Sequence, residues 1–130
     1  MFTNLTILND AQAMARHAAA RQTTVAQNIA NADTPGYKAR DMMSFSDVMA
    51  KGSAKMAMAV SRPGHIGAGS NAALTHSFED KTVEASPDGN TVGVETEMLK
   101  SIEAERQHSR AITIYQTSMN ILRSSIGRGR

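Results

Sequence analysis

The chain has 130 residues, a formal net charge of +2 and no cysteine, so one domain (residues 1–130) is expected, and disulfides, thiol catalysis and cysteine-based metal sites are excluded. Aromatic residues make up only 4% of the sequence and Ala supplies much of its 41% hydrophobic content, so an isolated monomer should bury little apolar area and be weakly stable. The nearly balanced charge gives no reason to expect a nucleic-acid or membrane partner.

The first predicted element is a long helix over about residues 5–32, a stretch without Gly or Pro. Its small and apolar residues step by three and four, which predicts a heptad seam along one face. The seam consists of Leu8, Ala11, Ala15, Ala18, Gln22, Val25, Ile29 and Ala32. Pro35 and Gly36 then end the helix in a sharp turn, because Pro cannot continue a helix and Gly supplies the positive φ that a type II turn needs.

The middle of the chain, residues 42–86, is rich in Met, Gly and small polar residues and is predicted to be irregular. Residues 56–60 and 73–75 have the composition of short strands, but both stretches are too short to predict a sheet.

A second long helix is predicted over about residues 94–126, after a turn-forming Ser-Pro-Asp-Gly-Asn stretch. Glu95 and Glu97 in its first turn and Arg123 in its last turn complement the helix macrodipole, and Gly127 is a candidate C-terminal cap. Its apolar seam comprises Met98 and Ile102 and, beyond a strongly polar stretch, Ile112, Tyr115, Met119, Leu122 and Ile126.

At 1.5 Å per residue the two helices would be roughly 40 and 50 Å long, which exceeds the ~30 Å diameter of a small domain. The predicted fold is therefore all-α, an elongated, coiled-coil-like pair of N- and C-terminal helices joined by a turn and an irregular middle over residues 33–93. The seams can serve an intramolecular coiled coil, a contact shared with neighbouring subunits, or both. Incomplete burial within one chain would favour polymerisation.

The stretch that ends the first helix resembles the signature of flagellar rod and hook proteins, in its FlgB-like form. The matching residues are Asn28, Ile29, Asn31, Asp33, Thr34, Pro35, Gly36, Tyr37, Lys38 and Arg40. A second stretch, residues 88–92, resembles the lead-in to the C-terminal helix of that family. Gly93 departs from the pattern, because the family usually has an acidic residue there. No room is left between the helices for the additional domains that longer rod and hook relatives carry.

The resemblance implies a structural subunit of the proximal rod of the bacterial flagellar basal body, which crosses the periplasm. The subunits would form a helical tube that links the membrane ring to the distal rod and transmits torque. Implied partners are copies of the chain itself, other flagellar rod proteins, the rod-to-membrane-ring adaptor FliE and the flagellar type III export apparatus. Export by that route would account for the missing cleavable secretory signal. Tyr37, Lys38 and Arg40 would present a contact to adjacent subunits.

The alternative function is a coiled-coil adaptor or another secreted type III component, which would share the heptads but would not require the signature. An enzyme is the least favoured class. No nucleophile elbow or Walker loop occurs, and His17, His65, His76 and His108 lack the spacing of a zinc site. We therefore expect no cofactor, metal or small-molecule substrate. The arginines near the C-terminus lack interleaved aromatic residues, so they do not predict nucleic-acid binding.

Overall fold

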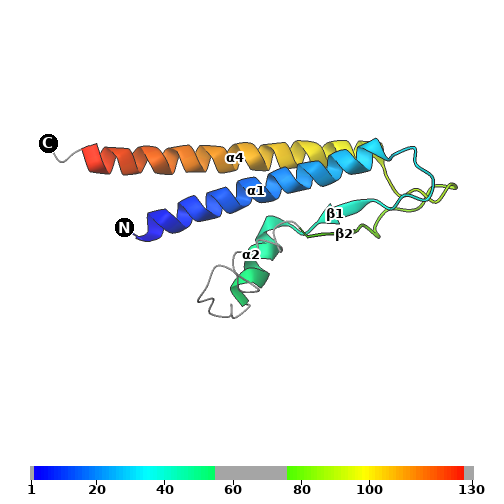
Figure 1. The fold of residues 1–130 in the computed structure, drawn as a ribbon, viewed down its shortest axis with the longest axis horizontal. Helices are drawn as coiled ribbons and strands as arrows, with labels where there is room; N and C mark the ends of the chain where they lie inside the picture. The colour runs from blue at the N-terminus through cyan, green and yellow to red at the C-terminus, as the bar shows by residue number, and fades with distance from the viewer. Residues whose placement is uncertain (1, 55–75, 128–130) are drawn as a thin grey trace, which may run out of the picture.

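Two long antiparallel helices dominate a computed structural model of the chain, in which residues 2–54 and 76–127 are described. Helix α1 spans Phe2–Ala30 and helix α4 spans Val94–Gly127. They lie side by side and make the most extensive contact between any two elements, with the start of α1 and the end of α4 at the same end of the pair (Figure 1). This arrangement confirms the predicted all-α, elongated fold. No helix among the described residues is long and apolar enough to cross a membrane.

A small antiparallel ribbon lies beside α1 (Figure 1). It pairs β1, Arg40–Met42, with β2, Ser77–Glu79, and Asp41 lies opposite Phe78. The candidate strands at residues 56–60 and 73–75 fall outside the described residues.

A short helix, α2, spans Phe45–Ala54 within the segment that was expected to be irregular. Ser44 caps its N-terminus, because the Ser44 hydroxyl accepts a hydrogen bond from the Asp47 backbone N–H at 3.2 Å and donates one to Asp47 Oδ2 at 2.7 Å. The Val48 N–H completes the first turn with a 3.0 Å bond to the Ser44 carbonyl. The Ser-x-x-Asp pattern was thus a local helix-start signal that the sequence analysis did not use.

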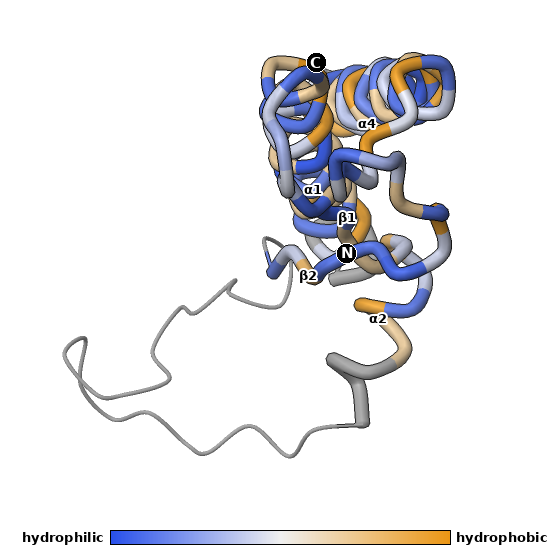
Figure 2. The backbone as a smooth tube through the Cα atoms, turned by 90° about the vertical axis from the view of Figure 1, so that its right-hand side faces the viewer, coloured by the Kyte–Doolittle hydropathy of each residue, from blue (hydrophilic) through white to orange (hydrophobic). Residues whose placement is uncertain are grey.

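The core between α1 and α4 consists mainly of small side chains. Ala11, Ala18 and Val25 are buried at seven-residue intervals on α1, and Ala104 and Ala111 are buried on α4. Such a contact brings the helices close together but removes little apolar surface from water. When the pair is viewed nearly end-on, hydrophobic segments are spread around both helices instead of gathering on one face (Figure 2).

Candidate functional site

The signature stretch at the end of α1, residues 28–40, pairs with the second stretch, residues 88–92, which lies before α4. The Gly36 N–H donates to the Asp88 carbonyl at 3.0 Å, and the Thr91 N–H donates to the Tyr37 carbonyl at 3.1 Å. Gly36 and Gly89 both have positive φ angles, 71° and 82°. A Cβ atom at Gly89 would lie 3.5 Å from the Gly36 Cα, so the two backbones meet closely at this point.

Asn90 binds the carbonyl groups of the turn that follows α1. Its side-chain Nδ2 donates to the carbonyls of Asn31 at 3.0 Å, Ala32 at 2.7 Å and Thr34 at 2.9 Å. Its Oδ1 accepts a 2.7 Å bond from the Val92 N–H. Because this one side chain binds three carbonyls of the turn, the second stretch, residues 88–92, holds the turn that follows α1 in place.

Asn28 is fully buried and joins α1 to β1 and α4. Its Nδ2 donates to the Arg40 carbonyl at 2.7 Å and to Glu97 Oε2 at 2.9 Å. Its Oδ1 accepts bonds from the Arg40 N–H at 3.1 Å and the Tyr37 hydroxyl at 3.4 Å. One amide side chain therefore fixes the position of the chain on both sides of the turn.

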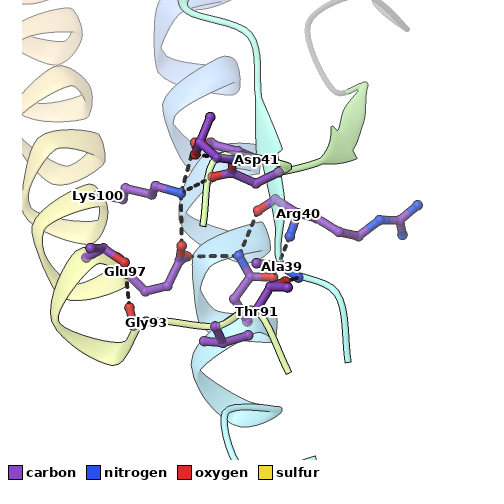
Figure 3. A network of polar contacts seen from close by, with 12 residues as sticks. Ala39, Arg40, Asp41, Thr91, Gly93, Glu97 and Lys100 are labelled. Atoms are coloured by element: carbon purple, nitrogen blue, oxygen red, sulfur yellow. Dashed lines mark hydrogen bonds and ion pairs between the residues drawn. The ribbon is translucent and has the colours of Figure 1, made fainter. Parts of the chain in front are cut away.

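Lys100 lies at the centre of a group of carboxylates, which we call the Lys100 cluster and define as Asp41, Asp80, Glu97 and Lys100. The Lys100 Nζ is 2.9 Å from Asp80 Oδ2, 3.0 Å from Glu97 Oε1 and 3.1 Å from Asp41 Oδ2. Figure 3 shows Lys100 reaching from α4 towards Asp41, with Glu97 one turn away on the same helix. Arg21 adds a second cation from α1, with its Nε 3.5 Å from Asp41 Oδ1.

Lys100 and Asp80 each stabilise the charged form of the other. Burial opposes the charge on Lys100, but hydrogen bonds to Asp80, Glu97 and Asp41 outweigh burial and raise the pKa of Lys100 above its usual value. Burial likewise opposes the charge on Asp80, but bonds from Thr82 and Lys100 prevail and lower the pKa of Asp80 to about 2. The cluster is therefore an ion-pair network throughout the neutral pH range.

Acid should destabilise the fold through Asp80. The folded-state pKa of about 2 lies below the ordinary aspartate pKa of 3.8, so the unfolded chain binds more protons between these values. The stabilisation is complete above about pH 4 and is lost as the pH falls through about 2, and it amounts to about 2 kcal/mol. Urea unfolding of the wild type and of Asp80→Asn across this range measures the effect. The variant should lose less stability on acidification, and equal losses would contradict the assignment.

Gly93 lies immediately before α4. Its carbonyl accepts hydrogen bonds from the Glu97 N–H at 2.9 Å and the Thr96 hydroxyl at 2.7 Å. A Cβ at this position would lie 2.8 Å from Thr96 Oγ1, so any side chain here would require Thr96 to move. Thr96 thus occupies the space that an acidic residue at position 93 would need.

The structure brings most of the signature residues to one joint. Tyr37 and Arg40 each donate a hydrogen bond to Asn28, and the carbonyls of Asn31 and Thr34 accept from Asn90. Gly36 pairs with Asp88, the exposed Lys38 donates from Nζ to the Gly89 carbonyl at 2.9 Å, Ile29 is half-buried, and Asp33 and Pro35 are exposed. We call this region the motif joint and define it as residues 28–41 and 88–100.

The predicted seam residues divide into two groups. On α1, Val25 is buried, Leu8, Ala15 and Ile29 are half-buried, and Gln22 is exposed. On α4, Met119 and Leu122 are half-buried, whereas Ile112, Tyr115 and Ile126 are exposed. The α4 seam residues therefore do not form the main contact within the chain, which uses Glu97, Ala104 and Ala111.

The apolar half of α4, residues 112–126, exposes a large amount of hydrophobic surface. Its exposed side chains are Ile112, Ile114, Tyr115, Ile121 and Ile126, of which Ile126 is 78% accessible. A helix that is hydrophobic on several sides is usually buried in a larger assembly.

The functional residues that the sequence analysis missed are mainly charged. The cluster combines three separate segments, which contribute Asp41, Asp80 and Lys100. The only signal in the sequence was the spacing of three residues between Glu97 and Lys100, which places both on one side of a helix. Within residues 2–54 and 76–127, no group of three or more His, Cys, Asp or Glu side chains is placed to hold a metal ion. Because the cluster carboxylates are bonded to Lys100, the site is suited to holding segments together.

Comparison with known proteins identifies relatives of this architecture. Residues 7–38 match the family described as "Flagella basal body rod protein". The chain is 37% identical to the flagellar basal body rod protein FlgB of Agrobacterium fabrum over 68% of both sequences. It is 34% identical to FlgB of Cereibacter sphaeroides, covering 82% of this chain and 77% of the relative. It is 33% identical to FlgB of Escherichia coli, covering 82% and 85%.

Proposed function

Because this chain belongs to the FlgB family of flagellar basal body rod proteins, and is thus a structural component of the rod and not an enzyme, we propose that it joins neighbouring rod subunits through the apolar half of α4. Family membership also implies association with other flagellar basal body components. It removes the support for the alternative, a generic coiled-coil adaptor.

The exposed apolar residues of α4 are the observation that carries this proposal. Ile114 and Ile121 are 43% and 53% exposed and lie seven residues apart, so they occupy the same side of α4. Complete burial of an Ile side chain contributes about 1.5–3 kcal/mol. Because the two side chains are already about half-buried, completing their burial contributes roughly half of that range for each, about 1.5–3 kcal/mol together, which favours assembly.

The signature residues support a second contact. Arg40 is exposed, and its side chain extends away from the Lys100 cluster (Figure 3). Lys38 is exposed beside it on the same segment. We propose that these two cations and Tyr37 contact an adjacent subunit, while Asn28 and the paired backbones keep their segment in place.

The proposals on the position of the chain in the rod and on its partners are based on its family membership. We propose that the subunits form a helical tube in the proximal rod, that the tube links the membrane ring to the distal rod, and that it transmits torque. The proposed partners are copies of this chain, other rod proteins and the adaptor FliE, with delivery by the flagellar type III export apparatus. The exposed α4 surface and the small apolar area buried within the chain support assembly from a weakly stable subunit.

Replacing Ile114 and Ile121 together by Gln tests the assembly surface. We expect the monomer to keep its helix content, because both side chains are exposed. Binding to the neighbouring rod subunits should weaken by about 1.5–3 kcal/mol, or roughly ten- to a hundredfold. Motility in soft agar and recovery of the chain in purified basal bodies measure the outcome. Glu105→Gln, also exposed on α4, is the matched control. Normal motility of the double variant would contradict the proposal.

A further inference from the structure

His17 is a buried titratable residue that the motif joint does not use. It is 0% exposed in α1, and its Nε2 lies 2.8 Å from the Met43 carbonyl oxygen. Because a carbonyl can only accept, Nε2 carries the hydrogen in this bond and Nδ1 is the unprotonated nitrogen of the neutral ring. The ring also packs against Phe45, with centroids 5.7 Å apart. His17 therefore contacts the segment at which α2 begins.

The surroundings of His17 disfavour a second ring proton. Nδ1 is buried and has no hydrogen-bond partner among the described residues. Arg21 lies one turn further along α1, and Phe45 is the first residue of α2, so the positive end of that helix dipole is also nearby. The opposing charges are Asp41 on β1 and Asp47 in the first turn of α2.

Neither carboxylate is hydrogen-bonded to Nδ1, and both are held by other groups. Asp41 is within 3.5 Å of Arg21 and 3.1 Å of Lys100. Asp47 accepts a 2.7 Å bond from the Ser44 hydroxyl. A proton on Nδ1 would therefore place a buried charge without an acceptor, which is unfavourable unless the contact opens.

We propose that His17 is a pH-responsive latch, which holds residues 43–48 on α1 when it is neutral and releases them when it is protonated. Release would free the start of α2, including the buried Val48, while the motif joint stays closed. The latch is separate from the assembly surface on α4, so it goes beyond the proposed function.

The direction of the pH effect follows from the electrostatics. Burial lowers the pKa of His17 below 6.5, and the Arg21 charge adds to this, whereas the Met43 carbonyl and Asp41 act in the opposite direction without prevailing. The released state consequently binds more protons than the latched state as the pH falls below 6.5. The latch is fully closed above this value and weakens as the pH decreases towards the folded-state pKa.

Two measurements on the full chain test the latch between about pH 7.5 and about pH 5, the range in which histidine titrates. NMR titration should give His17 a pKa below 6.5. Amide hydrogen exchange of residues 45–50, corrected for the intrinsic pH dependence, should accelerate at the lower pH, by up to tenfold for each unit of lowered pKa. His17→Gln should remove this acceleration, because the Gln amide can donate to Met43 but does not titrate.

His108→Gln is the matched control and should retain the wild-type acceleration, since His108 lies on α4. The proposal is overturned if His17 titrates at or above 6.5, or if exchange of residues 45–50 is the same at both pH values. Acceleration that persists in a folded His17→Gln variant would also overturn it. If that variant fails to fold, the wild-type chain alone tests the proposal. The pH at which exchange of residues 45–50 is half-accelerated must then coincide with the pKa of the His17 ring, and a mismatch would overturn the proposal.

Discussion

Lys100→Met is expected to destabilise the folded chain by about 3 kcal/mol, because it leaves three carboxylates close together with their shared cation removed. The Asp80 and Glu97 side chains are only 8% and 1% exposed, so water can replace the lost partner only in part. The loss falls at the lower end of the range for buried ion pairs, because Asp41 is 16% exposed and keeps Arg21 nearby. Urea unfolding followed by circular dichroism measures the change.

Two further variants decide whether the cluster causes that loss. Lys81→Met removes an exposed cation of the same kind and should change the free energy of unfolding very little. Adding Asp80→Asn to Lys100→Met should restore part of the stability, because one uncompensated charge disappears. If Lys100→Met unfolds at the same urea concentration as Lys81→Met, the cluster does not stabilise the joint.

Joint replacement of Pro35 and Gly36 by Ala should block rod assembly. Gly36 has a φ of 71°, a conformation that costs an L-residue about 1–2 kcal/mol, although a Cβ there would meet no atom within 4 Å. Without Pro35 the helix can continue past its present end, which would withdraw the carbonyls of Asn31 and Ala32 from Asn90. The two motifs would then separate.

Soft-agar motility and recovery of the chain in basal bodies measure this second effect. Gly127→Ala is a suitable control, because it adds the same methyl group at the end of α4 where no atom lies within 4 Å. We expect the control to swim normally and the double variant not to swim. A motile double variant would show that the turn is dispensable.

The long helices were predictable because their signals are local. Neither α1 nor α4 contains Pro, Gly occurs only as the last residue of α4, and Pro35 and Gly36 mark a sharp stop after α1. Helix α2 was also marked locally, by the Ser44 and Asp47 cap, but its Met- and Gly-containing surroundings obscured the signal.

The Lys100 cluster was not predictable, because Asp41, Asp80 and Lys100 are brought together only by the closed fold. The sequence also did not indicate which face of α4 contacts α1. Ala104 and Ala111 form that contact, although Ile112 and Tyr115 have a stronger apolar pattern. The two helices approach each other closely, so the contact between them buries the small Ala side chains. The larger Ile and Tyr side chains remain exposed for other contacts. The proposed roles of the signature residues in assembly stay predictions.

The Ala-lined contact gives the helix pair an adjustable geometry. Polar bonds fix the register of α1 and α4 at the motif joint, whereas Ala11, Ala18, Ala104 and Ala111 offer smooth surfaces farther along. A small change in crossing angle there moves mainly small side chains against each other, so it costs little free energy. The distance between the start of α1 and the end of α4 can therefore change slightly while the motif joint stays fixed. This allows a single sequence to fit against unlike neighbours without refolding.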